Sequence, residues 1–289
     1  VLYQPKALLG EQVFARFGAE FPIRFDFLDT MGGENLSLQV HPLTEYIKKQ
    51  FGMAYTQDES YYMLDAGEDA SVYLGLKEGI EKEEMLRDLN IANQGGKEFD
   101  AEKYINKFPA QKHDHFLIPA GTCHCSGKNA MILEISATPY IFTFKLWDWG
   151  RTGLDGRPRP VHIEHGKEVI QWDRTTSWVR ENLVNAVYEV TRTKDYVEEH
   201  TGLHELEFIE TRRYWIKKEV TIRTNGTFQM LNLIEGKEAV VKSKKGSFDP
   251  YIVHYAETFI IPADVEEYTI ETQGEEIGVI RAYVRGFHA

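Results

Sequence analysis

Short apolar runs separated by glycine and proline turns are the feature that most constrains the fold of this chain. Three of them lie near the middle of the sequence, at Phe116–Ile118, Met131–Ile135 and Tyr140–Trp149. Runs of this length, rich in aromatic and branched apolar residues and bounded by turns, are typical of β-strands. Many short strands with few helices indicate a sandwich or jelly roll, so we predict a mostly β chain.

A second β-rich region follows from about Leu203. Within it, Ile260–Ala263 resembles Leu117–Ala120 of the first region, which indicates a repeated jelly-roll half. The expected strands of this region lie near Phe208–Ile209, Phe228–Leu233, Glu238–Val241, Thr258–Ile261 and Ile277–Val284.

Helical periodicity is confined to a few segments. The spacing of apolar residues predicts helices over Leu8–Phe17 and Thr44–Phe51, and a charged, exposed helix over Glu78–Leu89. Residues Arg151–Asp173 are rich in glycine, proline and charge, and they predict an irregular segment that wraps the first region.

The composition excludes several classes of partner. The chain has 33 Lys and Arg against 45 Asp and Glu, a net charge of -12, which repels nucleic acids and anionic membranes. We therefore expect neither nucleic acid nor a membrane among its partners, and no apolar run approaches the roughly 20 residues that span a bilayer. The two cysteines, Cys123 and Cys125, stand too close along a strand to form a disulfide with each other. A reducing, cytoplasmic location is the expectation.

Four residues have the chemistry of metal ligands. In a strand, alternation places Gln39 and His41 on one face. Glu59 opens an apolar, aromatic run, and His124 begins a strand after a Pro/Gly turn. Two imidazoles, a carboxylate and an amide oxygen suit zinc or a similar divalent ion with open coordination positions. The residues themselves leave blander alternatives open: a polar pair at a strand end for Gln39 and His41, and a solvated carboxylate for Glu59.

The residues around His124 refine this interpretation. Alternation puts the thiols of Cys123 and Cys125 on the face opposite His124, which favours buried, inert cysteines over soft zinc ligands. In the second region, Glu267 takes the place of His124, so we expect no metal site there.

Three segments carry a resemblance to a known family. Leu36–Pro42, Pro119–His124 and Trp147–Pro160 resemble, in order and approximate spacing, the signatures of type I mannose-6-phosphate isomerases of the cupin superfamily. The match runs from about Leu9 to about His165. The resemblance implies a cupin-type double-stranded β-helix with two β-domains and a few helices. In that family a further segment precedes the first helix, so we expect the chain to lack it.

The resemblance also implies a domain organisation and a ligand set. Residues 1–165 form a metal-binding catalytic jelly roll, residues 166–202 a connecting segment, and residues 203–289 a second, metal-free cupin-like domain. The four metal ligands of the family fall on Gln39, His41, Glu59 and His124, and one divalent ion, zinc, is the implied cofactor.

Candidate catalytic residues come from the chemistry of aldose–ketose isomerisation, which needs a base and a group that stabilises negative charge. The base candidates near the metal motifs are Lys112, Glu134, Lys145 and Asp148. The resemblance ranks Arg151, Lys112 and Glu134 as catalytic, which leaves Lys145 and Asp148 to bind substrate. The structural alternative for Arg151 is an ion pair with Asp148 or Asp155.

Two departures from the family pattern bear on activity. Gln57 stands where members usually carry a lysine, which removes a positive charge beside the ligand Glu59. Thr143–Lys145 replaces the usual Thr-Tyr-Arg, which keeps a charge and loses the guanidinium fork.

The functional prediction is a divalent-metal-dependent isomerase that interconverts mannose 6-phosphate and fructose 6-phosphate, with a small sugar phosphate as its partner and the oligomeric state left open. The alternative is a metal-binding cupin that binds a sugar phosphate without turnover, motivated by Gln57 and Thr143–Lys145. A cupin oxygenase is disfavoured, because its iron site is usually built from His and carboxylate ligands, whereas Gln39 is a hard amide donor.

Overall fold

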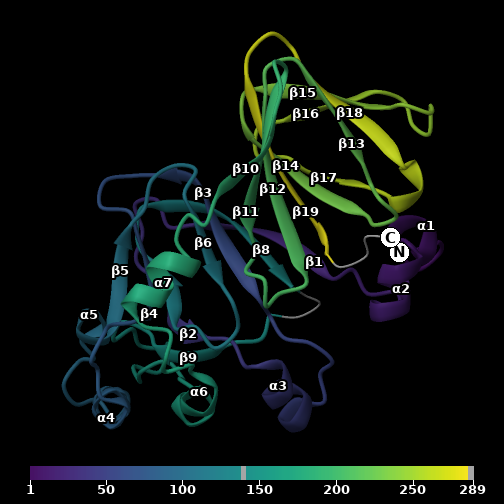
Figure 1. Cartoon of the computed structure of the whole chain (residues 1–289). Coiled ribbons are helices and arrows are strands. Elements are labelled where there is room, and N and C mark those ends of the chain that lie inside the picture. Colours follow the sequence, from purple (N-terminus) through teal and green to yellow (C-terminus); the bar gives the residue numbers. More distant parts are fainter. Residues whose placement is uncertain (138–140, 286–289) are drawn as a thin grey trace. The chain divides into compact units, whose positions relative to one another are not determined.

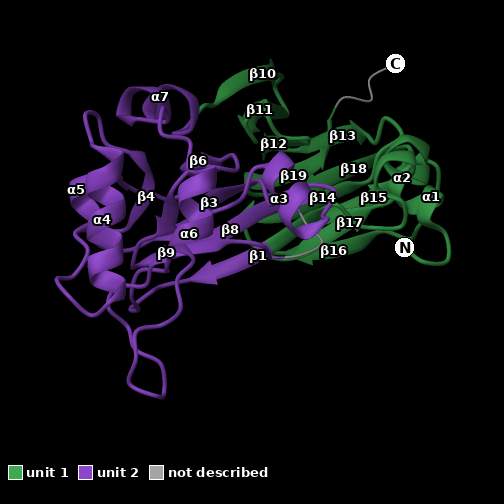
Figure 2. Cartoon of the chain, turned by 90° about the horizontal axis from the view of Figure 1, so that it is seen from below, with its two compact units in different colours: residues 1–25, 186–289 green, residues 26–185 purple. Residues whose placement is uncertain are grey.

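Antiparallel sheets dominate the computed structural model, which describes residues 1–137 and 141–285 (Figure 1). The chain divides into two compact units (Figure 2). The central unit comprises residues 26–185, and the terminal unit comprises residues 1–25 with 186–289. The predicted mostly β architecture is confirmed. Among the described residues, none of the helices combines the length and apolarity that crossing a membrane requires.

The central unit contains two antiparallel sheets, one with the strand order β1-β8-β3-β6 and the other with the order β5-β4-β7-β2-β9. Their strands are β1 (Ile23–Asp29), β2 (Leu38–Val40), β3 (Glu59–Ala66), β4 (Ser71–Leu76), β5 (Ile105–Pro109), β6 (His115–Ile118), β7 (His124–Ser126), β8 (Ala130–Ala137) and β9 (Phe144–Trp147). The predicted strand Tyr140–Trp149 is thus confirmed only over β9, and Tyr140 lies outside the described residues.

Alternation along β2 divides its side chains between two surroundings. Leu38 and Val40 are fully buried in an apolar core, together with Cys123 and Cys125. Both thiols are therefore on the apolar side of the sheet, as the sequence predicted, and burial raises the pKa of Cys123 to about 12. Gln39 lies on the other face of β2, which leaves that face for polar groups.

The helices of the central unit follow the prediction in part. They are α3 (Thr44–Phe51), α4 (Lys82–Asn93), α5 (Ala101–Tyr104), α6 (Ile163–Val169) and α7 (Thr176–Asn182). The α3 bounds agree with the sequence. α6, however, lies within a segment predicted to be irregular. Gly166 lets this helix pass close to β9, since a Cβ there would stand 2.5 Å from Leu146 Cδ2, and packing has overridden the local composition.

The terminal unit also contains two sheets, with the orders β10-β11-β12-β19-β14-β17 and β13-β18-β15-β16. An apolar core lies within it and includes Tyr214, Leu231 and Tyr268. The strands are β10 (Tyr188–Arg192), β11 (Tyr196–Gly202), β12 (Ile209–Ile216), β13 (Glu219–Arg223), β14 (Gln229–Glu235), β15 (Glu238–Ser243), β16 (Tyr251–His254), β17 (Thr258–Ile261), β18 (Glu267–Thr272) and β19 (Ile277–Val284), and a 3-10 turn, η1, spans Ala263–Val265.

Two predictions for this unit need correction. The helix predicted over Leu8–Phe17 is two helices, α1 (Pro5–Leu9) and α2 (Glu11–Phe17), broken at Gly10. Gly10 has φ +88°, and a Cβ there would lie 1.9 Å from the carbonyl oxygen of Gly226. The predicted connecting segment 166–202 includes the paired strands β10 and β11, and the residues of β10 are mostly exposed, which masks strand alternation there.

The predicted domain boundaries at residues 165 and 203 differ from the division into units, which falls after residue 25 and after residue 185. The assignment of a metal-binding role to one domain and a metal-free role to the other stays a prediction.

Candidate metal centre

Three neighbouring strands place polar side chains on one face of the second central sheet. Gln39 on β2 lies opposite His124 on β7 and opposite Lys145 on β9. Residues that pair across antiparallel strands share a face, so these three side chains lie in a row. His41 follows immediately after β2, two residues beyond Gln39, so alternation places it on the same face.

The fourth predicted ligand comes from the other sheet. Glu59 begins β3 and lies opposite Ile118 on β6 and Ser136 on β8. Two residues further along β3, Tyr61 lies opposite Glu134, so Glu134 shares the face that carries Glu59. The sequence prediction did not include Tyr61, although alternation from Glu59 was a signal that could have found it.

The ligand atoms of His41, Glu59 and His124 converge within 4.8 Å of one another. His41 Nε2 lies 3.1 Å from Glu59 Oε2, and His124 Nε2 lies 3.0 Å from Glu59 Oε1. Gln39 joins them, with its Nε2 atom 3.3 Å from His124 Nε2. The structure therefore brings together all four residues that the sequence predicted as metal ligands.

Backbone carbonyls orient both imidazoles. His41 Nδ1 lies 2.9 Å from Phe142 O, and His124 Nδ1 lies 2.8 Å from Thr122 O. Because each Nδ1 donates to a carbonyl, each Nε2 is left as the unprotonated lone pair that a metal requires. These two carbonyls are site components that sequence reasoning missed, since backbone groups carry no sequence signal.

Burial and the neighbouring charges shift the pKa values of the residues in this cluster. Burial alone would lower the pKa of His41, but the adjacent Glu59 carboxylate outweighs it, and the net pKa is raised above 6.5. Burial likewise opposes ionisation of Glu59, yet the two histidines hold its pKa well below 4.5. Glu59 Oε1 and His41 Nε2 are both buried without a hydrogen bond of good geometry. The donor set and these unsatisfied atoms fit a divalent cation.

Two residues before Glu59, the buried side chain of Gln57 makes two hydrogen bonds. Its Nε2 donates to Glu59 Oε2 at 2.8 Å, and its Oε1 accepts from the backbone N–H of Phe142 at 2.8 Å. The intervening Asp58 accepts from the N–H of Ala120 at 2.8 Å, and burial raises the pKa of Asp58 to about 6. The segment before β3 is thereby fixed to two other parts of the site.

Arg151 follows the end of β9. It forms an ion pair with the buried carboxylate of Asp148, whose other oxygen lies 3.5 Å from Arg159 Nη1. Ser37 Oγ also donates to Asp148 Oδ1, at 2.7 Å. Ser37 immediately precedes β2 and lies two residues before Gln39, so this group lies about 7 Å along the chain from Gln39. The ion pair named as the alternative for Arg151 is thus present.

The remaining candidates differ in position. Glu134 is buried, and its charge contributes to raising the pKa values of His41 and Tyr61, which places its carboxylate near the cluster. Lys112 is exposed in the turn before β6, beside Met63, because His113 N donates to Met63 O. Met63 is four residues along β3 from Glu59, about 13 Å. Lys112 therefore lies outside the group that the structure brings together.

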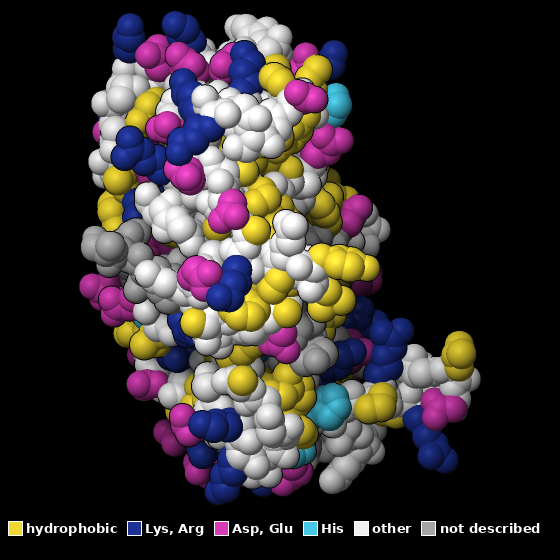
Figure 3. Space-filling view, turned by 90° about the vertical axis from the view of Figure 1, so that its right-hand side faces the viewer, with side chains coloured by type: hydrophobic (Ala, Val, Ile, Leu, Met, Phe, Trp, Pro, Cys, Tyr) yellow, Lys and Arg dark blue, Asp and Glu magenta, His cyan; other side chains and the backbone are white. Residues whose placement is uncertain are grey.

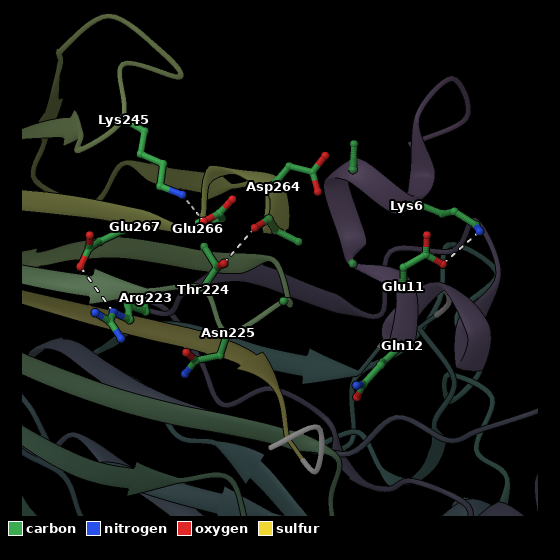
Figure 4. Close-up of a pocket in the computed structure, with 14 residues that line it drawn as sticks. Lys6, Glu11, Gln12, Arg223, Thr224, Asn225, Lys245, Asp264, Glu266 and Glu267 are labelled. Atoms are coloured by element: carbon green, nitrogen blue, oxygen red, sulfur yellow. Dashed lines mark hydrogen bonds and ion pairs between the residues drawn. The ribbon is translucent and has the colours of Figure 1, made fainter. Parts of the chain in front are cut away.

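A cavity of about 900 Å³ lies elsewhere, in the terminal unit (Figure 4). Three basic residues line it, and each is paired with an acid: Lys245 with Glu266, Arg223 with Glu267, and Lys6 with Glu11. Basic and acidic side chains are likewise interspersed over the face of the molecule in Figure 3. Because its charges are already compensated, the cavity has no evident chemistry for an anionic substrate.

Sequence comparisons connect the chain to sugar-phosphate isomerases. No family model matches it. A probable mannose-6-phosphate isomerase of Bacillus subtilis is 24% identical over 257 residues, covering 88% of this chain and 73% of that protein. A mannose-6-phosphate isomerase of Streptococcus mutans is 33% identical over 150 residues, covering 52% of this chain and 44% of that protein.

Structural comparisons give the same result. The mannose 6-phosphate isomerase structure from Bacillus subtilis matches with a TM-score of 0.74 at 20% identity, covering 92% of this chain and 76% of that one. A phosphomannose isomerase variant from Salmonella typhimurium matches with a TM-score of 0.72 at 15% identity, covering 97% and 83%. The predicted resemblance is confirmed: the chain is similar in sequence to mannose-6-phosphate isomerases and shares the fold of these solved structures.

Proposed function

We propose that this protein is a divalent-metal-dependent isomerase that interconverts mannose 6-phosphate and fructose 6-phosphate. The observation that carries the proposal is the buried convergence of His41, Glu59 and His124, with Gln39 beside them. The relatives reported above, which bear the name of this activity, support it. We further propose zinc as the ion and a cytoplasmic location, the latter because both cysteines are free, buried thiols.

Gln39, His41, Glu59 and His124 would hold the ion. When bound, it supplies positive charge that polarises the sugar oxygens and offsets the negative charge that develops as a proton leaves carbon. His41 and His124 present Nε2 in the required state because their Nδ1 atoms are engaged by carbonyls.

The proton transfer between adjacent carbons needs a base near the ion. Glu134 fits this role best, because it is buried on the face that carries Glu59 and its charge is felt at His41. It would take the proton from C2 of the aldose and return it to C1, while the hydroxyl proton of O2 passes to O1, so that the C1 aldehyde becomes an alcohol and C2 becomes the ketone carbon. Lys145, opposite Gln39, and Arg151, after the end of β9, supply cationic groups for the substrate oxygens and phosphate.

The experiment is a turnover assay on the full-length protein loaded with zinc, with mannose 6-phosphate as substrate and ketose formation as the readout. Formation of fructose 6-phosphate that stops on chelation and resumes on adding zinc is the expected result. Tight binding of mannose 6-phosphate with no ketose formation would instead favour the metal-binding cupin without turnover, the alternative that Gln57 motivates.

A further inference from the structure

Gln57 is a buried, neutral side chain that contacts the predicted metal ligand Glu59. It is 4% exposed, and both ends of its amide are used. The Phe142 N–H can donate only to the amide oxygen, which fixes the orientation of the group and leaves the nitrogen facing Glu59. The amide therefore serves as donor to a predicted metal ligand and as acceptor from a backbone segment at the same time.

These bonds close a ring. From Glu59, the ring passes through the Gln57 amide to the Phe142 N–H, and from the Phe142 carbonyl to His41 Nδ1. His41 Nε2 lies 3.1 Å from the same Glu59 oxygen that accepts from Gln57. The ring thus connects two ligand side chains to residues 141–144, the segment that leads into β9. A shift of any one of these groups would displace the others.

We propose that Gln57 is a positioning residue that fixes Glu59 and His41 in register and so sets the affinity of the cluster for a divalent cation. The inference rests on the proposed function only for the existence of the metal site. Hydrogen-bonded partners of metal ligands typically contribute 10- to 100-fold to metal affinity. The Gln57 amide acts on two ligands. It contacts Glu59 directly, and it reaches His41 through the backbone of Phe142.

A lysine at this position, as in the resembling family, has only half of this capacity. An ammonium group can donate to Glu59 but cannot accept from the Phe142 N–H. It also brings a positive charge next to the cation. A link between the Glu59 carboxylate and the backbone of residues 141–144 is therefore a property that glutamine gives to this chain, and it leaves the full carboxylate charge available to the ion.

The test is the dissociation constant for zinc, measured by competition with a chromophoric chelator on the full-length, metal-stripped protein without any sugar. Gln57→Met keeps the size of the side chain and removes both hydrogen bonds. The matched control is Gln229→Met, at a glutamine of the terminal unit that is 1% exposed and donates to Thr224 O and Thr227 O. Thermal unfolding of each metal-free variant confirms that it is folded.

We expect Gln57→Met to weaken zinc binding about 10- to 100-fold and Gln229→Met to leave it within about twofold. Cobalt-substituted Gln57→Met should show an altered visible absorption spectrum, which reports the ligand geometry. A folded Gln57→Met that binds zinc within about twofold of the unaltered protein overturns the proposal, because a merely structural glutamine changes stability and leaves affinity unchanged.

Gln57→Lys supplies a second test if Gln57→Met does not fold. It keeps a donor for Glu59, loses the acceptor for Phe142 and adds a charge, so zinc binding about tenfold weaker or more is expected. Unchanged zinc affinity in Gln57→Lys contradicts the role of the acceptor end. Because no sugar is present in the zinc titration, the two proposals fail separately. An unaltered protein that binds zinc and shows no isomerase activity counts against the proposed function and not against this inference.

Discussion

Two turns of similar sequence, one in each unit, end in different chemistry. In the central unit, the turn after β6 leads to His124, which enters the buried cluster with Glu59. In the terminal unit, the turn after β17 leads to Glu267, which lies 3.5 Å from Arg223 on the rim of the cavity in Figure 4. The comparison teaches that the fold supplies a position after the turn, and that the residue placed there decides whether the position can hold a metal.

The surroundings of buried carboxylates differ in the same way. In the terminal unit, Glu210 lies 2.7 Å from Arg212 Nε and 3.6 Å from Arg285 Nε, and one imidazole, that of His200, lies 3.2 Å away. The groups near Glu59 in the central unit include two imidazoles and the neutral amide of Gln57, and none of these three groups is an arginine. Arginine is always cationic, whereas an imidazole is neutral over much of the physiological range. The terminal unit balances its buried charge with its own side chains, and the central unit leaves a buried carboxylate for a cation.

The most direct test of this comparison is to replace the residue that follows each turn by alanine. His124→Ala removes a ligand and should weaken zinc binding more than about 100-fold, beyond the range for a supporting residue, with a matching loss of isomerase activity. Glu267→Ala removes an ion pair that is partly exposed and should change neither. Zinc titration and the turnover assay measure both variants, and equal behaviour of the two would show that His124 is not a ligand.

Arg151 and Arg159 test whether the charged group around Asp148 takes part in the reaction. If Arg151 stabilises developing charge, Arg151→Ala should lower kcat by about 10², the effect of losing one preorganised donor, without loss of zinc. Arg159 also pairs with Asp148 but is 48% exposed, so Arg159→Ala should have a small effect. A near-normal kcat for Arg151→Ala would assign this arginine to the ion pair and leave Glu134 and Lys145 as the residues to examine.

The grouping of the four predicted ligands could be predicted in part because strand alternation is a local rule. Strand alternation placed Gln39 and His41 together and separated His124 from its flanking cysteines, and the structure has this arrangement. The position of Lys112 outside the cluster could not be predicted in this way, because it depends on the direction in which β6 runs from the preceding turn. That direction is a property of sheet pairing, which a single sequence does not reveal.

The parts that could not be predicted are contacts between distant segments. α6 forms in a glycine- and charge-rich stretch because Gly166 fits against Leu146. The backbone N–H of Phe142 contacts Gln57 and its carbonyl contacts His41, although these residues lie 85 and 101 positions away in the sequence. Such contacts are chosen by packing in three dimensions, and local propensity has no information about them.

The two turns also differ in their backbone requirements. Gly121 has φ +89°, and a Cβ there would lie 3.0 Å from Val169 O and 2.6 Å from Gln171 Cγ. Its N–H donates to His41 O. Gly121→Ala should therefore cost about 2 kcal/mol in the free energy of unfolding, whereas Asp264→Ala at the exposed equivalent position should cost less than about 0.5 kcal/mol. Chemical denaturation measures both, and equal costs would contradict the backbone explanation.

The smallest expected effect concerns the compensated carboxylate of the terminal unit. Burial opposes ionisation of Glu210, but His200, Arg212 and Arg285 outweigh it and lower its pKa below 4.5. A lowered folded-state pKa contributes stability that is present above pH 4.5 and is lost as pH falls through the folded pKa. Glu210→Gln should therefore destabilise the protein by about 1.5 kcal/mol at pH 7, after discounting for the partly exposed arginines, and by less as the pH falls below 4.5. Denaturant titrations across this range measure the difference, with the exposed Glu205→Gln as control. A difference that does not shrink in acid would show that Glu210 stabilises through packing. At pH 7 the zinc affinity of Glu210→Gln should equal that of the unaltered protein.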